Sequence, residues 1–169
     1  NANKAYNKLL AEQEAVKASE FVFYNGNCSY NLKNNILMSM TEQILTLLYT
    51  EKVREEEGGT YGVYVSGALD KFPKESYNLQ IMFDTDPAKK DKLMQIILGE
   101  IQQIADKGTT QENLSKVKEF MLKKHTENQK ENGYWLGQID EMLFTGSDMS
   151  NEYVNIVNAI SNADIQKFA

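Results

Sequence analysis

The sequence predicts an α+β domain in which helices pack on one face of a mainly antiparallel sheet. In the first half of the chain, short segments alternate apolar and polar residues, as strands that bury one face do. In the second half, apolar residues recur at steps of three and four, the spacing of amphipathic helices. Strands followed by a block of helices are typical of α+β folds. The length of 169 residues suits a single hydrophobic core.

Three segments are predicted strands: residues 20–24, 61–66 and 77–84. The first is aromatic and β-branched, ends in turn-forming residues, and is apolar on both sides, so we expect it to be covered on both faces. The other two alternate and are joined by a loop that contains Lys71-Phe72-Pro73-Lys74. An antiparallel pairing is the simplest connection between them.

A first helix is predicted over about residues 34–55, because Leu37, Met40, Ile44 and Leu47 follow helical spacing. Gly58-Gly59 then supplies residues that close a helix and let the chain reverse. Residues 1–19 are interpreted as a connecting segment, and residues 20–169 as one domain. Because the chain begins with asparagine and ends in a helix that barely begins after Asn162, we expect both ends to be cut from a longer protein.

Four further helix signals follow. Asp86-Pro87 predicts a helix start, since the aspartate can accept from free amides and proline suits the first helical position. That helix stops at Gly108, and the next one opens with capping-box spacing from Thr109 to Glu112. Gly133 is expected to break it. Two shorter helices are predicted at about 134–145, with Leu136, Ile139 and Leu143, and at about 151–160, capped by Ser150.

Composition excludes several classes of function. The net charge of −6 and the pI near 4.9 argue against a nucleic-acid partner, which would require a basic face. No stretch approaches the roughly 20 apolar residues that a membrane helix needs. The lone Cys28 provides neither a disulfide nor a CxxC metal motif, and is interpreted as an ordinary small residue near a turn.

His125 is the only histidine, so neither the HExxH nor the HxxEH zinc motif can be present in these residues. The sequence therefore predicts no metal site in this chain. No recognisable nucleophile motif accompanies His125, and we interpret it as a surface or boundary residue rather than a catalytic base.

The segment from Arg54 to Val63 offers a more specific pattern, because Arg54 ends the first predicted helix and Tyr61 begins the next strand. The glycine pair between them would let the backbone fold tightly, so a guanidinium and a phenol could project toward one region. Both groups can donate to a peptide carbonyl, and arginine suits a developing oxyanion. The alternative is structural: Arg54 complements the helix dipole and Tyr61 only starts a strand.

The stretch from Leu48 to Val63 closely resembles the substrate-binding segment of the pitrilysin/insulinase family of zinc peptidases, in which an arginine and a tyrosine seven positions apart flank a glycine-containing turn. Arg54 and Tyr61 have that separation. The resemblance covers roughly residues 20–169 and is to the C-terminal-half domain of the family. It implies the fold predicted above, lacking some N-terminal strands.

The resemblance also implies a function. Zinc would be held through HxxEH in an N-terminal half outside these residues, and this chain would be the non-catalytic, substrate-binding half, inactive by itself. Arg54 would bind a substrate carbonyl or orient its neighbour, Tyr61 would hydrogen-bond the tetrahedral intermediate, and Gly58 and Gly59 would form the supporting turn. The partners implied are that zinc-binding half and a peptide substrate. Bacterial relatives are often periplasmic or associated with the cell envelope.

Two alternatives remain open. The chain could belong to an inactive paralogue or partner subunit of the same fold, which binds peptides or completes a chamber around an active subunit. It could also be a helical interaction module unrelated to proteolysis, with Arg54 and Tyr61 far apart or turned into the core. A sheet that lacks strands would expose an edge, through which the chain could self-associate.

Overall fold

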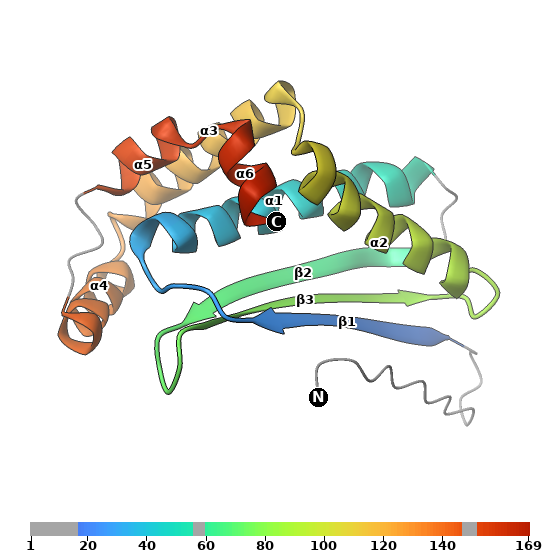
Figure 1. The fold of residues 1–169 in the computed structure, drawn as a ribbon, viewed down its shortest axis with the longest axis horizontal. Coiled ribbons are helices and arrows are strands. Elements are labelled where there is room, and N and C mark those ends of the chain that lie inside the picture. The colour runs from blue at the N-terminus through green and yellow to red at the C-terminus, as the bar shows by residue number, and fades with distance from the viewer. Residues whose placement is uncertain (1–16, 56–59, 147–151) are drawn as a thin grey trace.

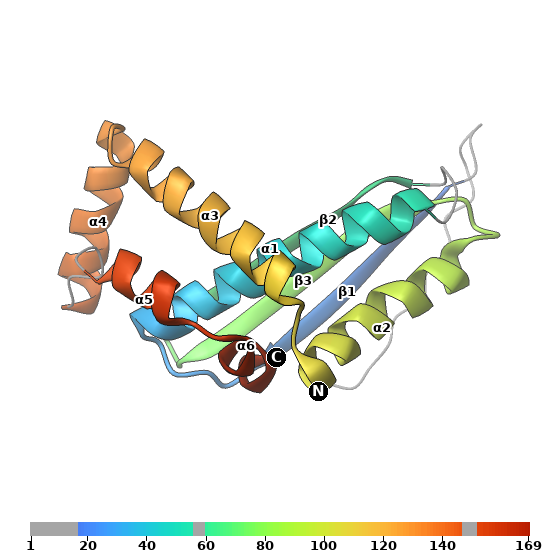
Figure 2. The ribbon, with the colours of Figure 1, turned by 90° about the horizontal axis from the view of Figure 1, so that it is seen from above.

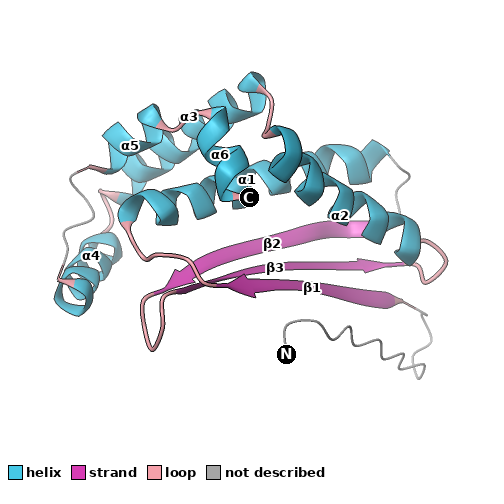
Figure 3. Ribbon diagram, in the orientation of Figure 1, coloured by secondary structure: helices cyan, strands magenta, loops and turns pink. Residues whose placement is uncertain are grey.

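The computed structural model describes residues 17–55, 60–146 and 152–169, and shows a sheet with helices packed on one face and one further helix, Asn132–Thr145, beyond its end (Figure 1, Figure 3). This confirms the predicted α+β class. The elements in chain order are β1 (Ala18–Gly26), α1 (Leu32–Glu55), β2 (Thr60–Asp70), β3 (Ser76–Thr85), α2 (Lys90–Lys107), α3 (Gln111–Asn128), α4 (Asn132–Thr145), α5 (Tyr153–Ala159) and α6 (Asn162–Phe168).

The described sheet has three strands in the order β1-β3-β2, and both pairings are antiparallel, as predicted for β2 and β3. On the central strand, Phe83 pairs with Glu20 of β1 and with Val63 of β2. Phe83 and its neighbour on the same face, Ile81, are almost fully buried beneath the helices. The alternation seen in the sequence therefore marks the face of the sheet that carries the core.

Among the described residues, no element covers the other face of the sheet, which we call its open face, and this corrects the expectation that the first strand is covered on both sides. Phe21 and Phe23 are 56% and 61% exposed, and their rings stack with centroids 6.3 Å apart. No described helix covers them, because the other helices lie over the opposite face and α4 lies beyond the end of the sheet (Figure 1). An antiparallel sheet covered on one side exposes every second residue of each strand.

Two layers of helices cover the inner face. α1 lies along the sheet with α2 beside it, and α3 crosses over α1 (Figure 2). α5 and α6 pack against α1 in this upper layer, and α6 also contacts α2. Side chains from both layers are fully buried where they meet, among them Met40, Ile44, Ile97, Val157 and Ile165.

The helix boundaries differ from prediction at three points. Asp86 caps a turn rather than the helix: its Oδ1 accepts from the Ala88 amide at 2.8 Å, and α2 begins only at Lys90. The N-cap of α3 is Thr110, whose hydroxyl accepts from the Asn113 amide at 3.1 Å, not Thr109. Gly133 lies inside α4 instead of breaking a helix. The predicted cap Ser150 lies outside the described residues.

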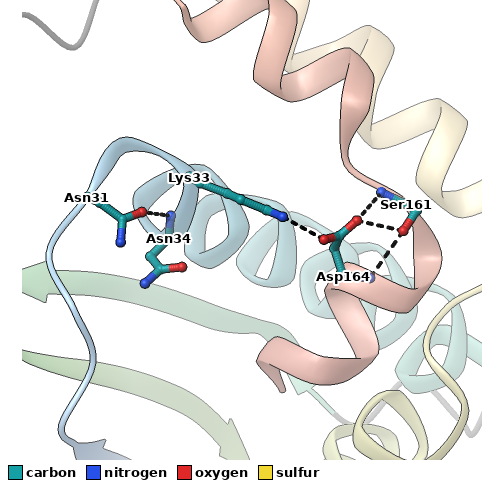
Figure 4. Close-up of polar contacts among 5 residues, drawn as sticks. All are labelled: Asn31, Lys33, Asn34, Ser161 and Asp164. Carbon is teal, nitrogen blue, oxygen red and sulfur yellow. Dashed lines mark hydrogen bonds and ion pairs between the residues drawn. The ribbon is translucent and has the colours of Figure 1, made fainter.

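α6 is tied to the start of α1 by a polar cluster (Figure 4). Ser161 and Asp164 form a capping box, in which the Ser161 amide and hydroxyl donate to Asp164 Oδ2 at 2.9 and 2.6 Å. Lys33 Nζ donates to the other carboxylate oxygen at 2.6 Å. At the start of α1, Asn31 Oδ1 accepts from the Asn34 amide at 2.9 Å. The residues after Asn162 thus form a capped helix that is held to the rest of the fold.

The Asp164 carboxylate is expected to make stability depend on pH. The hydrogen bonds from Lys33 and Ser161 lower its pKa. Its stabilising effect is therefore complete above the unfolded pKa of about 3.9 and is lost as pH falls toward the lower folded value. We expect Asp164→Asn to lower the free energy of unfolding by about 1 kcal/mol at pH 7.

Urea unfolding of the wild type and of Asp164→Asn between about pH 7 and pH 2 measures this effect. The difference between the two proteins should shrink below about pH 4. Asp106→Asn, at an exposed position of α2, is the control and should change little. A difference between Asp164→Asn and wild type that stays constant over the whole range would contradict the assignment.

Candidate functional site

The two predicted site residues lie on either side of one short connection. Arg54 is in the last turn of α1, and Tyr61 is the second residue of β2. Gly58 and Gly59, the predicted supporting turn, lie outside the described residues, as do the side chains of Arg54 and Tyr61. The backbone therefore brings a helix end and a strand start together, as the sequence predicts, while the roles of both side chains remain predictions.

The end of α1 is anchored to α2 immediately before Arg54. The Tyr49 hydroxyl donates to the Ile97 carbonyl at 3.0 Å, and burial raises the pKa of Tyr49, so it stays a neutral donor. One turn further on, Lys52 pairs with the buried carboxylate of Glu100. These contacts restrict movement of the last turns of α1, and so hold the backbone of Arg54 in place.

The Glu100 carboxylate is incompletely satisfied. Its side chain is 6% exposed, and Oε2 has no hydrogen-bond partner among the described residues. A buried carboxylate with a single charged partner depends strongly on that partner. Lys52 thus contributes to the anchoring of the helix end that carries Arg54.

The start of β2 is irregular where Tyr61 lies. Thr60 pairs with Thr85, the next registered pair is Val63 with Phe83, and the register shifts between them. Gly62 sits in this bulge with φ of +135°, a conformation that side-chain-bearing residues rarely adopt. Bulges redirect neighbouring side chains and are frequent beside functional sites. This bulge was not predicted from the sequence, although a glycine within a strand pattern is a recognised signal for it.

Arg54 is also the only arginine in the chain. The sequence contains 18 lysine and arginine residues, and the other 17 are lysine. Lysine therefore serves the other cationic positions, including the ion pairs described above. The planar guanidinium differs from lysine in its ability to bind a carbonyl or oxyanion with two parallel donors. This count is a signal that sequence reasoning could have used.

His125 is a buried structural residue, which corrects its interpretation as a surface or boundary histidine. Its ring stacks on Tyr153 with centroids 4.4 Å apart and meets Tyr134 edge-on at 5.9 Å. Burial lowers the pKa of His125, so the ring is neutral at pH 7. It joins α3, α4 and α5, because its aromatic partners come from the other two helices.

A cavity of about 270 Å³ lies apart from the Arg54–Tyr61 connection, between the end of β1, α1 and α6. Its lining is mostly apolar and includes Met38, Leu45 and Phe168, together with the free thiol of Cys28. Burial raises the pKa of that thiol, which disfavours the reactive thiolate. The cavity therefore has the character of a packing gap rather than a reactive centre.

The described residues offer no zinc site of their own. No three His, Cys, Asp or Glu side chains gather closely enough within them to hold a metal ion. Zinc sites in peptidases need three protein ligands, so the donor set here does not fit such a metal. Within the same residues, every helix is too short or too polar to span a bilayer.

The chain matches the family model described as the Peptidase M16 inactive domain over residues 7–121, which include Arg54 and Tyr61. This match spans more than half of the chain, which therefore belongs to that family. This confirms the resemblance of the chain to the C-terminal-half domain of the pitrilysin/insulinase family. The matched family consists of non-catalytic domains. Comparison with curated protein sequences gives no match.

Solved structures share the fold at low sequence identity. The periplasmic protease PqqL from Escherichia coli matches with a TM-score of 0.74 and 16% identity, covering 90% of this chain and 17% of that one. The ferredoxin protease FusC, solved in complex with Arabidopsis ferredoxin, has a TM-score of 0.75 and 12% identity with the same coverage. A peptidase M16 inactive domain from Pseudomonas fluorescens has a TM-score of 0.69 and 17% identity, with 89% and 36% covered. The chain thus spans about a sixth to a third of the length of these proteins.

Proposed function

We propose that this chain is the substrate-contacting, non-catalytic domain of a zinc-dependent peptidase. The observation that carries the proposal is the match to the M16 inactive domain across the α1–β2 connection, on either side of which Arg54 and Tyr61 lie. The metal would be held by a separate zinc-binding half, since the described residues offer no site for it. That half would close over a peptide bound against this domain.

The chemistry assigned to the two residues follows from their donors. A guanidinium presents a fork of N–H groups that can hold a substrate carbonyl and so position the peptide. A phenol donates one hydrogen bond to the oxyanion that forms when water attacks the amide. Three features support this assignment: the anchored end of α1, the bulge at Gly62 and the use of the only arginine. The metal chemistry itself belongs to the other half.

Arg54→Ala in the complete peptidase tests the proposal. Loss of a charge-assisted hydrogen bond to substrate should lower kcat/KM about 10- to 100-fold, with the zinc content per chain unchanged. Arg54→Lys keeps the charge and should recover only part of the activity. The measurements are peptide hydrolysis and metal analysis on the same preparations.

Two outcomes would count against the proposal in different ways. Equal kcat/KM for Arg54→Ala and wild type would remove the assigned role of Arg54. A complete protein that contains no zinc and hydrolyses no peptide would favour the alternative, a partner subunit of the same fold. In that case Arg54→Ala should weaken peptide binding instead.

A further inference from the structure

α4 turns its apolar side away from the molecule. Its outward side chains recur at steps of three and four along the helix and are 44% to 75% exposed: Trp135, Leu136, Ile139, Met142 and Leu143. The side that faces the body is half-buried and more polar: Tyr134, Gln138, Glu141 and Thr145. A surface helix normally buries its apolar stripe against the core. In α4 the apolar stripe instead faces the solvent, and the more polar side faces the core.

Specific contacts hold α4 in this orientation. The Tyr30 hydroxyl donates to the Glu141 carboxylate, and burial, with this hydrogen bond, raises the pKa of Tyr30 to about 12, so the donor stays protonated. Lys71 Nζ donates to the Thr145 carbonyl at 2.7 Å, and the Trp135 indole donates to the Gln129 carbonyl at 2.8 Å. Rolling the apolar side inward would break these contacts, so the exposed stripe is built into the fold.

The exposed surface extends beyond the helix. Phe144, at the end of α4, meets Phe72 of the β2–β3 loop edge-on with centroids 5.0 Å apart, and both rings are more than half exposed. With these rings the α4 surface offers roughly 700 Å² of apolar area, taking about 150–250 Å² for each large side chain and counting only its exposed fraction. The largest apolar patch on a monomer is ordinarily about 300–600 Å².

We propose that this surface, defined as the outward side of α4 together with Phe72 and Phe144, is the contact between two copies of this chain. Its area is close to the roughly 800 Å² that each partner contributes to a standard stable interface. Two copies of one helix can pack about a two-fold axis, so that the same apolar residues meet each other. The five outward side chains carry no charge, and the carboxylate of Glu141 is already engaged on the inner side, so the charge on this surface is that of the exposed Asp140, which lies between Leu136 and Phe144.

The location of α4 leaves the candidate site free. α4 lies beyond the first residues of α1, whereas Arg54 is in the last turn of that helix, at the other end of the molecule (Figure 2). Pairing through α4 would therefore hold two copies together while each keeps its α1–β2 connection accessible. The inference does not depend on the proposed peptidase function.

The open face of the sheet is the competing surface. It carries Phe21, Phe23, Tyr64 and Met82, which amount to roughly 400 Å², within the ordinary range for a monomer. Self-association through the sheet edge, which the sequence led us to expect, would instead use the backbone of β1 or β2, the strands that border this face. It supplies the matched control for the α4 surface.

Sedimentation of the complete protein over about 1 to 100 µM tests the proposal. We expect a monomer–dimer equilibrium with a Kd in the micromolar range or below. Leu143→Lys, at a side chain that is 75% exposed, should weaken the dimer at least about 100-fold without unfolding the monomer. Phe23→Lys makes the same change at a 61% exposed position of the sheet and should leave Kd unchanged.

Salt provides a second readout. The 169 residues of each copy carry a net charge of −6, so screening should tighten an apolar dimer as salt increases. Circular dichroism and thermal unfolding check that the variants remain folded, and Ile139→Ser replaces Leu143→Lys if that variant does not. A chain that is monomeric throughout the range, a dimer that survives the α4 substitutions, or a dimer lost only with Phe23→Lys would overturn the proposal.

Discussion

Replacing Tyr61 with phenylalanine in the complete peptidase is expected to lower kcat about 100- to 1,000-fold, the usual cost of removing one oxyanion donor. The substitution deletes a single hydroxyl and leaves the strand-forming aromatic ring. Because the assigned hydrogen bond forms only with the tetrahedral intermediate, KM should change little. The zinc content should also stay constant, since the metal is assigned to the other half.

Tyr64→Phe is the matched control for this experiment. Tyr64 lies three residues further along β2, on the open face of the sheet, and is 60% exposed. The same hydroxyl is removed from the same strand, so kcat should remain at the wild-type value. If Tyr61→Phe and Tyr64→Phe turn over substrate equally well, Tyr61 has no role in the chemistry.

Phe83→Ala is expected to be the most destabilising of the substitutions considered, by about 3–5 kcal/mol. Phe83 is 2% exposed on the central strand β3, between strands β1 and β2 and beneath the helices. Its removal would leave a cavity between the sheet and the helices that cover it. For a chain of this size the melting temperature should fall by roughly 6–20 °C.

Phe23→Ala is the control for Phe83→Ala, because it removes the same side chain from the open face of the same sheet. Phe23 is 61% exposed, so we expect a loss of less than about 1 kcal/mol. Thermal and urea unfolding followed by circular dichroism measure both effects. Similar losses for the two variants would show that the open face is covered in solution.

Much of the fold could be predicted from periodicity. Strands β2 and β3 and the helix α1 appear where alternating or three-and-four spacing predicts them, because burial against one core imposes that spacing. Helix starts were less predictable. Asp86 and Thr109 both have capping chemistry, but whether such a residue caps a helix or a turn depends on how the following residues pack.

The candidate site, like the fold, could be predicted only in part from the sequence. Arg54 and Tyr61 could be found from residue type, their spacing and the resemblance to a family. The bulge at Gly62 and the anchoring of α1 by Glu100 could not, because both arise from pairing with segments distant in the sequence: β3 and α2. Residue types identify Arg54 and Tyr61 as hydrogen-bond donors, whereas contacts with α2 and β3 fix the position of the backbone on either side of the connection.

The order of apolar and polar residues by itself determined the α+β class and the strands β2 and β3, and the arginine, tyrosine and glycines between Leu48 and Val63 indicated the family. Only the tertiary structure decided which apolar residues stay in contact with water: Phe21 and Phe23 on the sheet, and the outward side of α4. The physical reason is that periodicity reveals a stripe of apolar residues but not the surface it faces. That surface is formed by other parts of the chain, such as Tyr30 and Lys71, which hold α4 with its apolar side outward.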